Sequence, residues 1–218
     1  MKRVASSPFP MATISSPDVN SSNKTHATWD DKNLGETRRM NPADYVRYFI
    51  PHEDAYANPA TSNFALNYHK TNISPGYTMA AVTAIRANDL ATLRKLHAAG
   101  HDFNACNANG EYLIHLACRR SSAATVQFLL TEAKVCPTVR DTMGRTILHD
   151  ICWKSFADVN TMALALSVVP PQMLLAQDVR GHTPFDFCRQ NHWGTWITFL
   201  VERHAILHER LSLRLAEQ

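Results

Sequence analysis

The chain has 218 residues, 45% of them hydrophobic, and its 22 Lys and Arg against 19 Asp and Glu give a formal net charge of +3. This apolar content is sufficient for a folded domain, yet no stretch of about 18 apolar residues is present that could cross a membrane. The small positive charge argues against a protein that binds nucleic acid mainly through its phosphates.

Residues 1–40 are rich in Ser, Asn, Thr and Pro, with scattered charges. Because such a segment cannot bury enough apolar area to offset the entropy of ordering its backbone, we predict a disordered N-terminal arm. Lys2 and Arg3 are not followed by a continuous apolar segment, so no secretory signal is expected. The protein is therefore interpreted as intracellular, either cytoplasmic or nuclear.

Residues 41–75 are predicted to form one short helix and a linker. Asn41 is a suitable N-cap, Pro42 fits the first turn, and Pro51 ends the pattern. The apolar residues between them recur at helical spacing: Tyr45, Val46, Phe49 and Ile50. Because short helices are marginal in water, docking on the exposed face of the first unit of the following domain is favoured. The alternative is a linear motif that is offered to a partner.

A turn pattern then recurs along the chain. Gly110, Gly144 and Gly181 lie 34 and 37 residues apart, and an Asn or Asp precedes each glycine by three positions, as in tight turns that end at positive φ. Thr146 and Thr183 follow as N-caps of new helices. A period of this length indicates stacked structural repeats.

Two apolar segments with helical spacing follow each turn. In the second repeat they are Leu113–Arg120 and Ala123–Glu132. Met79–Ala87 and a segment that begins after Asp89 repeat this arrangement upstream, without the turn motif. We therefore predict an all-α solenoid of about four helix-turn-helix repeats with β-turn tips over residues 76–203.

The motif at residues 146–149, Thr-Ile-Leu-His, resembles the Thr-Pro-Leu-His motif of the ankyrin-repeat family. The turn glycines and the stretch Ala99–Asn104 carry the same resemblance, which extends over about two-thirds of the chain. It implies a non-catalytic module that binds other proteins.

The resemblance also implies a structural role for His115 and His149, whose imidazoles would bond to neighbouring backbone. Asp186 replaces this His in the last repeat, and Met79–Ala81 replace the whole motif in the first. The third repeat is lengthened around Pro170. These departures affect individual repeats and not the array.

The C-terminal segment, residues 204–218, is predicted to be a capping helix, because the last unit of a stack has no neighbour to cover its apolar side. Its apolar residues continue the pattern of Ile197, Phe199 and Leu200 at the end of the last repeat; they are Ile206, Leu207, Leu211, Leu213 and Leu215. The alternative is a partner-binding helix with Leu211 and Leu215 exposed.

No catalytic residue, cofactor or metal is predicted, since the sequence has no phosphate-binding glycine loop and no nucleophile elbow. His204 and His208 lie one helical turn apart, but Ala205 stands where the zinc-protease motif requires Glu. Cys118 and Cys152 each lie three residues after a motif His, in a slot for a small residue. They are interpreted as reduced packing residues.

The resemblance implies that partners contact the turn tips and the ends of the first helices, which together form a concave face. Carried over to this chain, the candidate partner-binding residues are Arg86, Arg119, Arg120, Arg140, Arg145, Trp153, Lys154, Arg180 and His182. Positive charge is thus concentrated where binding is expected. We predict a monomer that binds an acidic segment of an unidentified protein, with Trp153 as an aromatic anchor.

Two other interpretations of this face remain open. The arginines could brace neighbouring repeats through Asp141, Asp150 or Asp178, since surface ion pairs need no partner to explain them, and Trp153 could pack between repeats. The same basic face could instead bind nucleic acid or a phosphoinositide, although no basic run interleaved with aromatic residues supports this.

Overall fold

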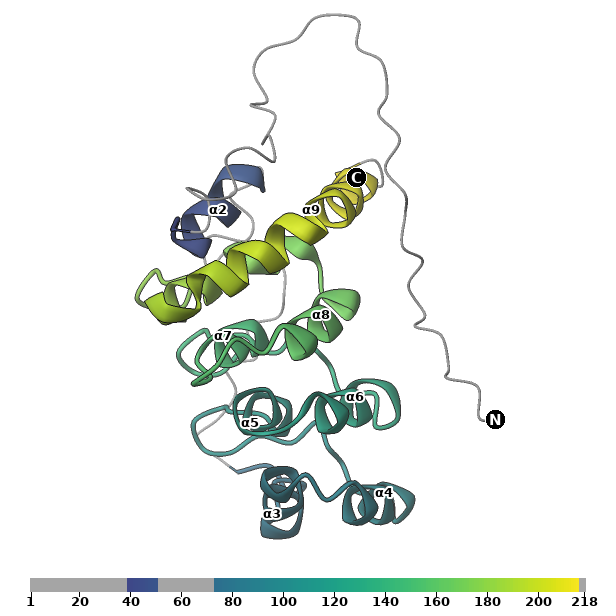
Figure 1. Ribbon diagram of the computed structural model, residues 1–218. Helices are drawn as coiled ribbons and strands as arrows, with labels where there is room; N and C mark the ends of the chain where they lie inside the picture. Colours follow the sequence, from purple (N-terminus) through teal and green to yellow (C-terminus); the bar gives the residue numbers. More distant parts are fainter. Residues whose placement is uncertain (1–38, 51–72, 216–218) are drawn as a thin grey trace, which may run out of the picture. The chain divides into compact units, whose positions relative to one another are not determined.

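The computed structural model describes residues 39–50 and 73–215, which lie within one unit of the chain, Lys32–Gln218 (Figure 1). The predicted disordered arm, residues 1–40, falls outside the described residues except at its last two positions. Most of the predicted linker, residues 51–72, also lies outside them.

Three helical hairpins stack on one another, so that the first helices form one column and the second helices another (Figure 1). The hairpins are α3 (Met79–Ala87) with α4 (Leu90–Ala98), α5 (Leu113–Arg120) with α6 (Ala123–Thr131), and α7 (Ile147–Cys152) with α8 (Val159–Val168). Apart from two isolated bridges at the turns, the described residues contain no β-structure. The predicted all-α repeat solenoid is confirmed.

Local signals explain where these helices begin. The side chains of Thr78, Asp89 and Asp158 each accept a hydrogen bond from the backbone N–H three residues later. Such caps satisfy donors that have no partner within the helix. Between α3 and α4 the chain reverses at Asn88, which adopts a left-handed conformation with φ 55°.

The turns between hairpins share one geometry. In each, the side-chain oxygen of the first residue accepts bonds from the backbone N–H groups two and four residues later; these first residues are Asn107, Asp141 and Asp178. The glycine three positions on has a φ of 65° to 81° in the three turns. A side chain disfavours this left-handed conformation, which explains the recurrence of glycine.

The motif histidines join each repeat to the next. Nδ1 of His115 accepts the backbone N–H of Tyr112 at 3.2 Å, and its Nε2 donates to the carbonyl of Arg145 at 3.2 Å. His149 makes the equivalent bonds to Thr146 and to the carbonyl of His182, at 3.0 and 3.1 Å. The structural role expected for both imidazoles is confirmed.

The core runs through the stack as a continuous set of buried aliphatic side chains between the two helix columns. Each fully buried Leu or Ile contributes about 1.5–3 kcal/mol relative to exposure. Cys118 and Cys152 are buried within it, and burial raises the pKa of both thiols, which is the behaviour of packing residues. Within the described residues, no helix is both long and apolar enough to span a bilayer.

The fourth unit differs from the other three. After the short 3₁₀ helix η2 (Pro171–Leu175) and the turn, its first helix shrinks to η3 (Pro184–Phe187) and η4 (Gln190–His192), and its second becomes the long α9 (Trp193–Leu215). The predicted limit between the repeat domain and the capping helix, at residues 203 and 204, falls inside α9.

Helix α9 closes the end of the stack. Its buried side chains include Trp196, Ile197 and Leu200, and Trp196 meets the ring of Phe185 edge-on. The guanidinium of Arg210 donates to the carbonyls of Leu166 and Val169 at the end of α8. The side chains of Leu211 and Leu215, named for the alternative partner-binding role, lie outside the described ones.

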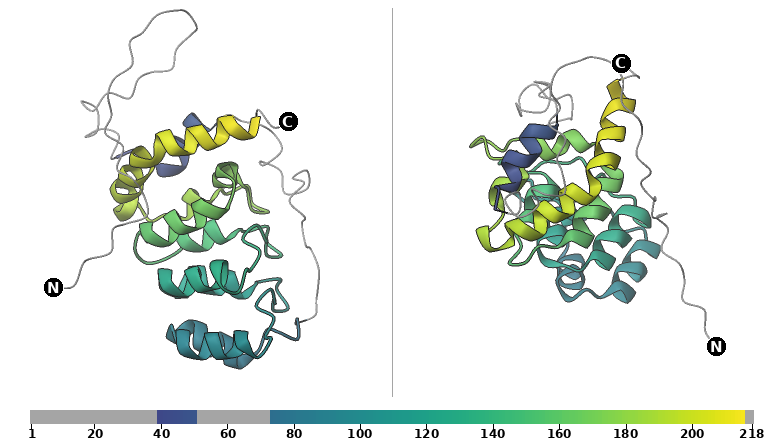
Figure 2. Two further views of the ribbon diagram at one scale, coloured as in Figure 1. Left: turned by 90° about the vertical axis from the view of Figure 1, so that its right-hand side faces the viewer. Right: turned by 45° about the horizontal axis from the view of Figure 1, so that its top comes forward.

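Helix α2 (Pro42–Phe49) packs against α9 and η3 of the last unit and against η2, which precedes that unit (Figures 1 and 2). The prediction that it docks on the first repeat is therefore wrong. Its apolar face is buried, so it is not presented as a free motif either. The position is fixed by complementary groups: Arg47 pairs with Asp186 at 2.6 Å, and the Tyr45 hydroxyl lies 3.2 Å from Nδ1 of His204.

Candidate partner-binding face

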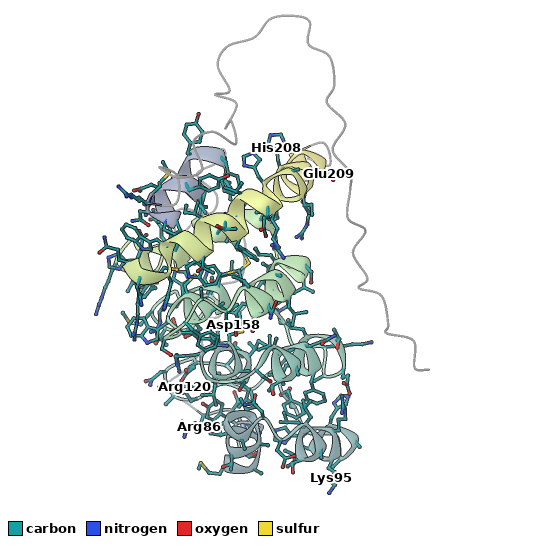
Figure 3. The ribbon with its side chains drawn as sticks, in the orientation of Figure 1. Arg86, Lys95, Arg120, Asp158, His208 and Glu209 are labelled. Atoms are coloured by element: carbon teal, nitrogen blue, oxygen red, sulfur yellow. The ribbon has the colours of Figure 1, made fainter. Side chains whose placement is uncertain are left out.

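The C-terminal ends of the first helices place corresponding residues on successive repeats. Arg86, Arg120 and Lys154 each lie eight residues after the N-cap of α3, α5 and α7, while Arg119 and Trp153 lie seven residues after it. Figure 3 shows Arg86 and Arg120 beside the neighbouring helices α3 and α5. This end of the first helices and the turn tips form what we call the basic face.

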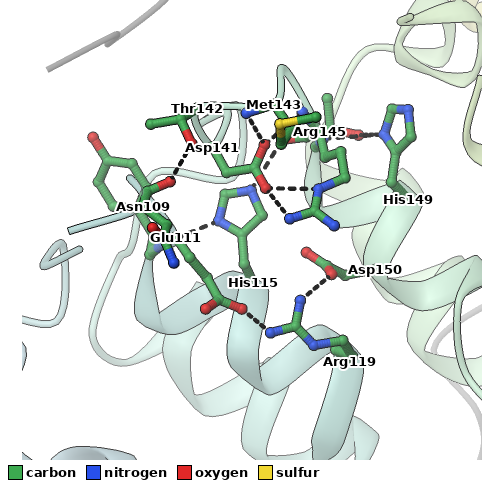
Figure 4. Close-up of polar contacts among 12 residues, drawn as sticks. Asn109, Glu111, His115, Arg119, Asp141, Thr142, Met143, Arg145, His149 and Asp150 are labelled. Carbon is green, nitrogen blue, oxygen red and sulfur yellow. Dashed lines mark hydrogen bonds and ion pairs between the residues drawn. The ribbon is translucent and has the colours of Figure 1, made fainter. Parts of the chain in front are cut away.

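Two of the predicted arginines brace the domain. Arg119 pairs with Glu111 of its own turn and with Asp150 of the next repeat, the latter at 2.7 Å (Figure 4). Arg145 donates from Nε to Asp141, also at 2.7 Å, within the turn that begins at Asp141. The interpretation that arginines brace neighbouring repeats is thus correct for Arg119, whereas Arg145 pairs within its own turn. Both side chains have limited capacity for a further acidic ligand.

Arg140 and Lys154 are buried, which corrects their assignment to the partner-binding surface. Arg140 is 2% exposed and donates to the carbonyls of Gly144 and Gln177. Lys154 is 5% exposed; its ammonium donates to the carbonyl of Ser121 in the preceding repeat at 2.8 Å and pairs with Asp158 at 2.6 Å. Buried charges need such partners because desolvation is costly, so neither charge can reach a ligand.

Burial also shifts the pKa of Asp150, the carboxyl group that pairs with Arg119. It raises the pKa of Asp150 to about 7, while Arg119 and Arg145 act in the opposite direction. The ion pair between repeats therefore weakens as the pH falls below neutrality. Burial likewise lowers the pKa of His115 and His149 to about 4, so both rings are neutral at pH 7.

Arg86, Arg120 and Arg180 are exposed, and none of them forms an ion pair with a described residue. The carboxylates of this face are already engaged by turns or by bracing arginines: Glu111, Asp141, Asp150 and Asp178. Within the part of the chain that the structure describes, the charge of the three exposed guanidinium groups is consequently not cancelled by an ion pair. It is available to an external anion.

Aromatic rings lie on the same face, at the third and fourth units. Trp153 is 54% exposed, and its ring centroid is 5.4 Å from that of Phe187. The ring of His182, whose side chain is 53% exposed, lies edge-on to Phe187, with its centroid 5.8 Å away. Trp153 therefore both meets the next unit and offers a free surface. We call these three rings the aromatic cluster.

Sequence reasoning missed Phe187 and the exposed Phe156. Phe187 directly follows Asp186, in the register position that Leu116 occupies in the second repeat, where a buried core side chain is expected. Phe156 lies in the loop after α7, three residues from Trp153, and its ring is 5.6 Å from the ammonium of Lys154. For Phe156 the signal was its closeness to Trp153 in the sequence, whereas Phe187 lies 34 residues from Trp153 and no such signal pointed to it.

The remaining histidine pair belongs to the α2 contact. The rings of His204 and His208 stack at 6.3 Å, and His204 also lies against Phe49 of α2 at 5.1 Å. In the described part of the chain, no group of three His, Cys, Asp or Glu side chains is placed to hold a metal ion.

Comparison with known proteins gives two findings. Residues 79–168 match the family model described as "Ankyrin repeats (3 copies)", which corresponds to the three hairpins from α3 to α8. A segment of 65 residues is 34% identical to "Putative glutaminase 2" of Caenorhabditis elegans and covers 30% of this chain. That segment spans only 11% of the length of the worm protein, so it does not establish an enzymatic activity here.

Proposed function

Because this chain is an ankyrin-repeat protein, with its repeats at residues 79–168, we propose that it is a non-catalytic interaction module whose basic face binds an acidic segment of a partner protein. Ankyrin repeats mediate protein–protein interaction. The acidic character of the partner segment is our own addition to that general role.

One observation supports it most directly: exposed arginines without an ion pair lie on the same face as an exposed tryptophan. Arg and Trp are enriched among residues that dominate binding energies, because they supply large contact areas and charge-assisted hydrogen bonds. Uncompensated positive charge also steers a negatively charged partner and accelerates the encounter.

Direct binding of nucleic acid or phosphoinositide is less well supported. Of the seven predicted basic residues, Arg119, Arg140, Arg145 and Lys154 are engaged within the domain. Three arginines on separate repeats supply few simultaneous phosphate contacts, whereas affinity for nucleic acid depends on the number of phosphates neutralised.

Affinity capture with charge-reversed protein tests the proposal. Proteins retained from a cell extract by the wild-type chain should be lost with Arg120→Glu combined with Trp153→Ala. They should be kept with Lys95→Glu, a matched reversal at an exposed position on the second helix α4 (Figure 3). Arg119 is left unchanged because its substitution would break the brace to Asp150.

Retention of the same proteins by the double variant, with unchanged thermal unfolding, would contradict the use of this face. Titration with labelled DNA, RNA and anionic vesicles at two salt concentrations addresses the other ligand class. Tight binding with a steep salt dependence would replace the proposed function with that alternative.

A further inference from the structure

The exposed groups of the basic face follow the stacking of the repeats. Arg86 and Arg120 occupy equivalent positions on α3 and α5, and Trp153 lies at the same end of α7. These three helices are in contact in that order. Packed helices have axes about 8–10 Å apart, so the equivalent residues Arg86 and Arg120 are separated by about one such step. Trp153 occupies the preceding position on α7, one helix further along the stack.

A polyproline II helix matches this step. It has about three residues per turn and rises about 3.1 Å per residue, so every third side chain returns to the same face after about 9 Å. A flat β-strand alternates its side chains with a period of two and would turn residues i and i+3 to opposite faces. An α-helix would cover the same distance in about six residues.

The chemistry of the face changes along this direction. At the third and fourth units the aromatic cluster offers an apolar surface, since the exposed ring of Trp153 packs beside Phe187. At the second and first repeats the exposed groups are the guanidinium groups of Arg120 and Arg86. Arg119, which precedes Arg120 on α5 and pairs toward the third repeat, is already neutralised by Glu111 and Asp150 and should have little preference for charge.

We propose that the partner segment binds along the basic face as an extended, polyproline II-like strand with a defined spacing. An apolar side chain contacts Trp153 and Phe187, and acidic side chains three and six residues away pair with Arg120 and Arg86. This inference rests on the proposed function and adds the register and conformation of the ligand. Either chain direction satisfies the geometry, because a polyproline II strand presents its side chains similarly in both.

Selection of peptides on the immobilised full chain tests the spacing. The probe is a random dodecapeptide library, and the readout is the enrichment of each residue type at each distance from an apolar anchor. Wild-type protein should enrich Asp and Glu three and six positions from the anchor, on the same side of it. For one enriched peptide, replacing the nearer acid by its amide should weaken binding about two- to fivefold, as for an exposed ion pair.

Charge-reversed variants assign each position. Arg120→Glu should convert the preference at position three from acidic to basic and leave position six unchanged, whereas Arg86→Glu should do the reverse. Trp153→Ala should remove the preference for an apolar anchor, and Lys95→Glu should select the same peptides as wild type. A merely destabilised domain could not change one position alone, and thermal unfolding of each variant monitors the fold.

The outcomes separate the two proposals. Enrichment of acidic peptides without fixed spacing, or equal effects of Arg86→Glu and Arg120→Glu at both positions, would overturn the register while the captured proteins still support an interaction module. Absence of both captured proteins and enriched peptides would overturn the proposed function itself. Selective binding of oligonucleotides or vesicles in place of peptides would also overturn both.

Discussion

The buried motif histidines make the stability of the domain sensitive to acid, and His149 provides the sharpest test. Its ring is buried, accepts the N–H of Thr146 and donates to the carbonyl of His182. Burial lowers the pKa of His149 to about 4, well below the ordinary value of 6.5. The unfolded chain therefore binds a proton more readily than the folded one. The stabilising effect is complete above pH 6.5 and is lost as the pH falls towards 4.

The size of this pH dependence follows from the one additional proton that each histidine binds when the chain unfolds. Between those two values the unfolded state carries about one proton more at this site, so the free energy of unfolding falls by about 1.4 kcal/mol per pH unit. Over the whole window the loss is about 3 kcal/mol for His149. His149→Gln removes the titrating group, and its slope against pH should be smaller than that of wild type by about 1.4 kcal/mol per unit.

Urea unfolding followed by circular dichroism at about pH 7, 6 and 5 measures this difference. The comparison between variant and wild type is needed because Asp150, with its pKa raised to about 7, acts with the opposite sign: its contribution declines as the pH rises. His115→Gln should give the same reduction in slope, and the double variant about twice as much. Parallel slopes for wild type and both single variants would refute the reasoning.

Three further predictions concern packing and backbone. Lys154→Met leaves Asp158 and the carbonyl of Ser121 without their cation, so it should lower the free energy of unfolding by about 3 kcal/mol. A loss below about 1 kcal/mol would contradict the structural role of Lys154. Val46→Asp places a charge in a contact that is 1% exposed, so amide exchange in α2 should become fast while α3–α8 stay protected; unchanged protection of α2 would contradict its docking. Gly144→Ala should cost about 1 kcal/mol in urea unfolding because φ is 73° there, and no loss would show that the turn has relaxed.

The sequence was sufficient to predict the repeating unit and the local geometry of its turns and helix ends. The Asn or Asp and the glycine of each turn, the N-cap threonines and the apolar spacing act over a few residues, and the structure reproduces them at Asp141, Gly144 and Thr146. The resemblance to ankyrin repeats supplied the role of the histidines and the location of the basic face. The domain limits inferred from the sequence, residues 41–75, 76–203 and 204–218, remain predictions.

Which arginines can meet a partner could not be read from the sequence. Arg119 and Arg120 are adjacent and chemically identical, yet one pairs with Asp150, 31 residues away, and the other is exposed. The difference depends on the direction of each side chain at the end of α5 and on the carboxylate that the next repeat brings beside it. The aromatic cluster has the same origin, since Trp153 and Phe187 meet only through stacking of the third and fourth units.

The sequence alone determined the repeating unit, because turns and helix ends are specified by neighbouring residues whose conformational preferences are intrinsic. Tertiary structure decided where α2 docks and which charges remain exposed. Arg47 pairs with Asp186, which is 139 positions away in the chain. The two side chains come together only once the repeats have stacked.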